Sequence, residues 1–167
     1  MTTTNEPAVE PAALRASVRE KYREVAVHPD GAFHFHTGRP LAALLGYDSE
    51  WVAALPDRAV ESFAGVANPF SLRPISRADR VVEVGSGGGF DSIVAAHLVG
   101  TDGRVIGVDM TPEMLAKSQE TARLLGLDHV GLNDDDRYVT DRERADLIVG
   151  LIQAGHTDRI LLSSNAI

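Results

Sequence analysis

The chain carries Val81-Val82-Glu83-Val84-Gly85-Ser86-Gly87-Gly88-Gly89-Phe90-Asp91, followed farther along by Val105-Ile106-Gly107-Val108-Asp109. The Val-rich run from Arg80 to Val84 is too short for a helix and predicts a buried strand. The glycines after it permit a sharp turn and a close approach of ligand to backbone. We expect a helix over Phe90 to Val99 and a second strand over Arg104 to Val108. The pattern predicts one βαβ unit with a nucleotide-type site where the strand order reverses.

Two acids in this unit indicate which ligand the site takes. Asp109 ends the second strand, at the spacing where a carboxylate accepts hydrogen bonds from both ribose hydroxyls. Glu83 lies inside the end of the first strand, where it would repel a pyrophosphate but would attract a cationic sulfonium and an α-amino group. The residues therefore favour S-adenosylmethionine. An NAD-dependent dehydrogenase is the weaker alternative, because dinucleotide sites use the spacing G-x-G-x-x-G.

The glycine motif and the run Asp109-Met110-Thr111-Pro112-Glu113-Met114-Leu115 resemble the class I S-adenosylmethionine-dependent methyltransferases. Within that class the chain is most similar to the arsenite methyltransferase group. Further matches upstream keep the order used by that group: Leu45-Gly46-Tyr47, Leu55-Pro56, Ala59-Val60 and Asn68-Pro69. The resemblance extends from about Val18 to Val130.

The resemblance implies a role for each matching residue of the cofactor site. Gly85, Gly87 and Gly89, with Ser86 between them, would pass under the methionine part of the cofactor. Glu83 would contact its amino group, Asp109 its ribose hydroxyls, and Met110 its adenine. Asn68, with Pro69, would belong to the segment that shapes the entrance. No catalytic residue is predicted, because displacement at a sulfonium requires positioning of the acceptor rather than an acid/base pair.

The chain departs from the group in the residues that would bind arsenic. Soft metalloids prefer thiolate ligands, and the 167 residues contain no cysteine. Val66 stands where a thiolate is expected. The sequence therefore predicts a methyltransferase of this type whose small-molecule acceptor is unknown.

The last part of the chain differs from the group as well. Residues Gly131 to Arg137 predict a polar turn, Asp141 to Ala154 an amphipathic helix ended by Gly155, and Arg159 to Ser163 a strand. Residues 138–167 resemble a segment of phosphotriesterase-type amidohydrolases, with Asn165 near the place of a metal-binding Asp. A barrel that holds such a metal needs about 250 residues, so no metal site is expected. Either this helix and strand complete the sheet, or the tail reflects a gene fusion.

These elements predict an α/β fold: an incomplete, Rossmann-like, doubly wound and mainly parallel sheet with an N-terminal helical cap. Residues 1–11 predict a disordered tail, 12–75 a helical cap and entrance segment, and 76–167 the truncated Rossmann-like domain. A helix is expected over Ala12 to Val27, and another from Pro112, capped by Thr111, to Gly126. An exposed strand edge at Ile160 to Ser163 would favour a homodimer.

Composition limits the classes of partner. The formal net charge is −8 and 44% of the residues are hydrophobic, which argues against nucleic acid and acidic membranes. The lack of cysteine, of an apolar run of ~18 residues and of a signal peptide leads us to expect a cytoplasmic location.

Two points stay open in the sequence. His34 and His36 would share one face of a strand, and they are compatible with a metal site, an acceptor pocket or a structural loop. The main competitor to a methyltransferase is a non-catalytic remnant that binds the cofactor but lacks the half that chooses an acceptor.

Overall fold

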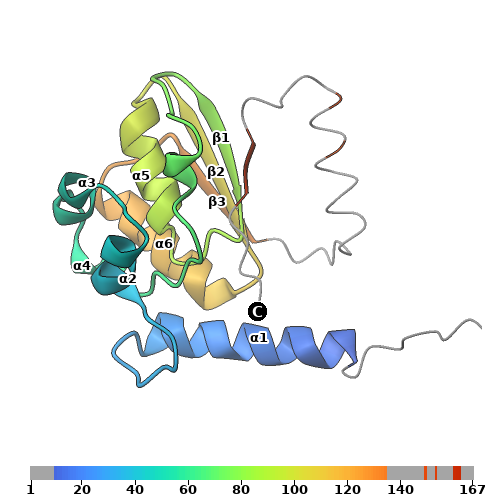
Figure 1. The fold of residues 1–167 in the computed structure, drawn as a ribbon. Helices are drawn as coiled ribbons and strands as arrows, with labels where there is room; N and C mark the ends of the chain where they lie inside the picture. The colour runs from blue at the N-terminus through green and yellow to red at the C-terminus, as the bar shows by residue number, and fades with distance from the viewer. Residues whose placement is uncertain (1–9, 135–148, 150–152, 154–159, 163–167) are drawn as a thin grey trace, which may run out of the picture.

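A four-stranded parallel sheet forms the centre of the computed structural model, which describes residues 10–134, 149, 153 and 160–162 (Figure 1). Its strands are β1 (Arg80–Val84), β2 (Arg104–Asp109), β3 (Val130–Asp134) and β4 (Ile160–Leu162), in the order β3-β2-β1-β4. Strands β2 and β3 follow one another on one side of β1, and β4, the last strand in the sequence, lies on its other side. The reversal next to β1 confirms the Rossmann-like architecture and places a switch point at the carboxyl ends of the strands.

Helices α5 (Phe90–Val99) and α6 (Pro112–Leu124) connect these strands and lie on the same side of the sheet (Figure 1). Every residue of α5 from Phe90 to Ala96 is buried, whereas His97 is exposed. The reason is that α5 lies between two layers. Its Ala95, Ala96 and Val99 pack on the sheet, while Phe90, Ile93 and Val94 pack on the N-terminal helices.

β3 corrects the expectation of a polar turn over residues 131–134; residues 135–137 of that expected turn lie outside the described residues. Val130 pairs with Val105 and Asp134 with Asp109, so the strand lies parallel to β2. Strand β3 is at the edge of the sheet, where one apolar face is enough. Leu132 supplies that face by packing on Leu115 of α6.

β4 lies within the strand expected at Arg159 to Ser163 and pairs with β1, Val82 opposite Ile160. This confirms that a strand of the tail completes the sheet. Of the helix expected at Asp141 to Ala154, Val149 and Gln153 are helical and the rest lies outside the described residues. Asn165 and the predicted disordered tail, apart from its last two residues, also lie outside them.

The N-terminal layer consists of short helices around an aromatic core. Its elements are α1 (Pro11–Val27), α2 (Gly38–Leu44), α3 (Ser49–Ala54), α4 (Asp57–Val60) and the 3-10 turn η1 (Pro69–Ser71). Tyr47 and Phe63 share one core with Phe90 of α5. The core therefore crosses the domain boundary expected at residues 75 and 76, and that boundary stays a prediction.

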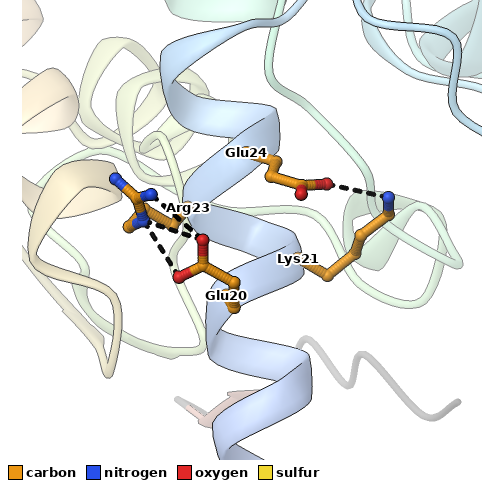
Figure 2. Close-up of polar contacts among 4 residues, drawn as sticks. All are labelled: Glu20, Lys21, Arg23 and Glu24. Atoms are coloured by element: carbon orange, nitrogen blue, oxygen red, sulfur yellow. Dashed lines mark hydrogen bonds and ion pairs between the residues drawn. The ribbon is translucent and has the colours of Figure 1, made fainter.

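Helix α1 packs against α6 near its carboxyl end (Figure 1). The apolar residues of α1 are only partly covered, because Val25 is fully buried whereas Leu14 is 49% exposed. Glu20 pairs with Arg23 and Lys21 with Glu24 along its exposed surface (Figure 2). Within the described part of the chain, no helix is both long and apolar enough to cross a membrane.

Candidate functional site

The glycine loop joins the carboxyl end of β1 to the start of α5. Gly85, Gly87 and Gly89 have φ angles of 81°, 52° and 85°, which residues other than glycine rarely adopt. The backbone N–H groups of Gly85 and Ser86 donate to the Val108 carbonyl oxygen at 2.8 and 2.9 Å. The loop is thus fixed against β2, and its shape requires the glycines that the sequence singles out.

Two of these glycines serve different purposes. A Cβ atom on Gly89 would lie 2.6 Å from the Cβ of Ser118, so Gly89 allows α5 and α6 to approach closely. A Cβ on Gly87 would meet nothing within 4 Å. The backbone of Gly87 is therefore open on that side, as close approach of a ligand requires.

Asp109 joins the two halves of the site. One carboxylate oxygen accepts from the N–H of Gly87 and the other from the N–H of Thr111, both at 2.8 Å. Burial raises the pKa of Asp109, and these backbone hydrogen bonds act in the opposite direction. Burial and then the Asp109 charge raise the pKa of Tyr22. The effect of the Asp109 charge indicates that Tyr22 of α1 lies near the site.

Two further acids lie on either side of the glycine loop, and both are almost completely buried. Glu83 is 2% exposed and accepts a short hydrogen bond from the hydroxyl of Ser92; Asp91 is 4% exposed. Burial, and then the charge of Asp91, raises the pKa of Glu83 well above its ordinary value. Burial raises the pKa of Asp91 to about 7, while a hydrogen bond from Tyr47 lowers it.

The hydrogen bond from Tyr47 is the feature of the site that sequence reasoning missed. Tyr47 lies in the connection between α2 and α3, and its hydroxyl donates to Asp91 at 2.7 Å. The resemblance includes Tyr47 but gives it no role. The two residues are 44 positions apart, and no local pattern indicates that they meet.

The remaining predicted residues are placed as follows. Met110 follows Asp109 directly and is half-buried. Ser86 is buried, and its hydroxyl has no hydrogen-bond partner within the described part of the chain. The side chain of Asn68 bonds to residues outside the glycine loop: its amide nitrogen donates to the Gly46 carbonyl at 3.0 Å, and its oxygen accepts from the Phe70 N–H at 3.1 Å. The contacts of all three residues with a cofactor stay predictions.

His34 and His36 are exposed in an irregular segment between α1 and α2, so the strand expected there is wrong. Phe33 and Phe35 stack with ring centroids 5.4 Å apart. The ammonium group of Lys21 lies over the ring of Phe33, 5.2 Å from its centroid. These ring contacts organise the segment in place of strand pairing. Across the described ranges, no group of three or more His, Cys, Asp or Glu side chains is arranged to hold a metal ion.

Comparison with known proteins agrees with this geometry. Residues 75–149 match the family model described as a methyltransferase domain. This part of the chain is therefore similar to a methyltransferase domain. The matched residues include the glycine loop, Asp109 and the helices on their side of the sheet.

Curated relatives match different lengths of the chain. The arsenite methyltransferase of Halobacterium salinarum is 36% identical over 137 residues, covering 72% of this chain and 35% of its own length. A protein-L-isoaspartate O-methyltransferase 2 of Anaeromyxobacter sp. is 43% identical over 67 residues, covering 40% and 26%. The chain thus spans about a third or less of the length of these relatives.

Among solved structures, an arsenic (III) S-adenosylmethionine methyltransferase from Chlamydomonas reinhardtii is 34% identical with a TM-score of 0.45. The match covers 55% of this chain and 32% of that one.

The methyltransferase domain points to S-adenosylmethionine as the cofactor, in agreement with the sequence. The residues present fit that group in two respects. The backbone is open at Gly87, and the carboxylate of Asp109 is held beside it. In their ionised form, the buried acids Glu83 and Asp91 complement a ligand that carries positive charge on its sulfur and its amino group.

Proposed function

We propose that this domain binds S-adenosylmethionine at the glycine loop and transfers its methyl group to a small-molecule acceptor. The observation that carries the proposal is the hydrogen bond between the Asp109 carboxylate and the Gly87 N–H at the carboxyl ends of β1 and β2. It holds a ribose-binding acid next to an open stretch of backbone. This is the arrangement expected of a nucleoside site at a switch point.

When bound, the cofactor supplies an electrophilic methyl group on a positively charged sulfur, which becomes a neutral thioether as the acceptor's electron pair takes the methyl carbon. The chain's part is to bind, orient and exclude water. Asp109 fixes the ribose, and the glycine loop lets the methionine part lie against the backbone. The negative charge of the buried acids favours the cationic cofactor over its neutral-sulfur product.

The acceptor is proposed to be something other than thiolate-bound arsenite. The similarity to an arsenite methyltransferase suggests arsenic, but these 167 residues contain no cysteine to bind it. Val66, where a thiolate is expected, is 56% exposed. We propose a small-molecule acceptor, no nucleic-acid partner in view of the net charge of −8, and a cytoplasmic location.

Calorimetry and label transfer test the proposal in two steps. S-adenosylmethionine and S-adenosylhomocysteine are titrated into the protein, with NAD as the competing ligand. Binding of S-adenosylmethionine and S-adenosylhomocysteine, with no binding of NAD, supports the cofactor site. The absence of binding of the first two at millimolar concentration overturns it. The protein is then incubated with methyl-labelled cofactor and a panel of arsenite, thiols, amines and carboxylates. Label transfer supports the enzyme, while binding without transfer to any acceptor favours a cofactor-binding module.

A further inference from the structure

Tyr47 connects the N-terminal helices to the cofactor loop. Its ring packs among Phe63, Phe70 and Phe90, with centroids 5.4, 6.0 and 5.0 Å away. Its hydroxyl donates to Asp91 at 2.7 Å and lies 3.2 Å from the carbonyl oxygen of Ala67. The ring therefore belongs to the core of the N-terminal layer, while the hydroxyl reaches the second residue of α5.

Asp91 belongs to a group of acids that surrounds the glycine loop. Glu83 lies two residues before Gly85, and Asp91 lies two residues after Gly89. Charge on Asp91 and on Asp109 acts on Glu83, and Tyr22 of α1 lies near Asp109. Burying several acids together is unfavourable unless hydrogen bonds or a cation stabilise their charge.

We propose that Tyr47 is a positioning residue of the cofactor site: its hydroxyl favours the anionic form of Asp91 beside the glycine loop, where ionised Asp91 and Glu83 attract the positively charged methionine end of S-adenosylmethionine. The inference rests on the proposed function, because it concerns the charge that the cofactor meets. It adds that the packing of the N-terminal helices and the affinity for cofactor are linked through one hydroxyl. Tyr47 touches neither cofactor nor acceptor in this role.

The protonation of the group gives this role a distinctive consequence. Burial raises the pKa of Asp91 to about 7, and the hydrogen bond from Tyr47 opposes that rise. Burial and the charge of Asp91 raise the pKa of Tyr47 itself, so the hydroxyl remains a donor. Protons and the cationic cofactor therefore compete for the same acids. Affinity for S-adenosylmethionine should rise with pH through neutrality.

The test measures affinity by calorimetry between about pH 6 and pH 8.5 for the protein and three variants. Tyr47→Phe keeps the ring but removes the donor, so the pKa of Asp91 rises. We expect its affinity for S-adenosylmethionine to fall about tenfold near pH 6.5 and to approach that of the unchanged protein at the alkaline end. Asp91→Asn removes the titrating group, so its affinity should be low and should vary less with pH.

Phe70→Leu is the matched control, because it removes a ring that contacts Tyr47 but leaves the hydroxyl of Tyr47 in place. Its affinity should keep the pH midpoint of the unchanged protein. S-adenosylhomocysteine, which lacks the charge on sulfur, should show a smaller pH dependence than S-adenosylmethionine in every variant that retains Asp91.

The possible outcomes separate this inference from the proposed function. A shifted midpoint in Tyr47→Phe alone supports the inference. Equal loss of affinity at every pH in Tyr47→Phe, or the same shift in Phe70→Leu, makes Tyr47 a packing residue and overturns it. If the unchanged protein binds no S-adenosylmethionine, the proposed function fails first and the inference fails with it.

Discussion

The carboxylate of Asp109 accepts a hydrogen bond from the Gly87 N–H at 2.8 Å, so the acid that ends β2 is tied to the loop that follows β1. Its second oxygen accepts from the Thr111 N–H and thereby fixes the start of α6. One side chain thus determines the relative position of three elements around the switch point. A ligand that bonds to Asp109 meets an acceptor whose orientation is already set.

Asp109→Asn should weaken binding of S-adenosylmethionine by at least about tenfold, because the amide loses the charge and one of the acceptor oxygens that ribose hydroxyls require. The measurement is calorimetry at neutral pH. Asp102→Asn is the matched control: this acid is exposed in the turn between α5 and β2, and its change should leave affinity unaltered. Equal affinity in both variants would contradict the assignment of Asp109.

Gly89→Ala should lower the free energy of unfolding by about 2–4 kcal/mol, since the added methyl group meets Ser118 and alanine must also adopt the positive φ of Gly89. Gly126→Ala isolates the second effect. Gly126 has a φ of 66° and nothing within 4 Å of an added Cβ, so it should cost only about 1 kcal/mol. Urea unfolding of both variants compares them. A smaller loss in Gly89→Ala than in Gly126→Ala would mean that α5 and α6 can separate at little cost.

The buried acids should make stability depend on pH. Because the folded-state pKa of Asp91 is raised to about 7, the folded protein keeps a proton that the unfolded chain has already released. Stability is therefore full below the unfolded pKa near 4 and is lost as the pH rises to about 7, by ~2–4 kcal/mol. Urea midpoints at pH 5 and pH 8 measure the effect.

Asp91→Asn tests the origin of that loss, because its amide oxygen can still accept from Tyr47 but carries no titrating proton. Its midpoint should change less between the two pH values than that of the unchanged protein. If Asp91→Asn and the unchanged protein respond to pH alike, the loss of stability arises from another group, and Asp91 does not hold the proton.

The parts of the fold that were predictable are those written in local patterns. The Val-rich run before Gly85 and the Thr111-Pro112 start of α6 each depend on neighbours in the sequence. The structure confirms the strand and the helix start at Pro112, although the Thr111 side chain makes no capping hydrogen bond. The third strand was missed because an edge strand needs only alternate apolar residues. Leu132 and Val130 supply them between residues that are typical of turns.

The site was predictable to the same extent. Gly87 and Asp109 meet because the carboxyl ends of adjacent parallel strands share one edge, and that follows from the βαβ pattern alone. The pairing of Tyr47 with Asp91 depends on how the N-terminal helices pack on α5. Packing of separate layers leaves no periodic signal, so this hydrogen bond could not be inferred from the sequence.

Lys117 offers a test of how the N-terminal helices are held on the sheet. Its ammonium group lies 2.6 Å from a carboxylate oxygen of Glu61 and 3.3 Å from the Ala26 carbonyl, and the side chain is 6% exposed. It therefore joins α6 to the ends of α1 and α4. Lys117→Met preserves the stem but removes the charge, and should lower the free energy of unfolding by about 1–3 kcal/mol.

Arg23→Met is the control for this change, because Arg23 pairs with Glu20 on the exposed surface of α1 (Figure 2). An exposed pair contributes little, so this variant should lose less than about 0.5 kcal/mol. Limited proteolysis gives a second measurement: cleavage within α1 should accelerate in Lys117→Met alone, since that helix then loses its polar attachment to α6. Similar cleavage rates in the two variants would show that apolar contacts such as those of Val25 hold α1 in place without Lys117.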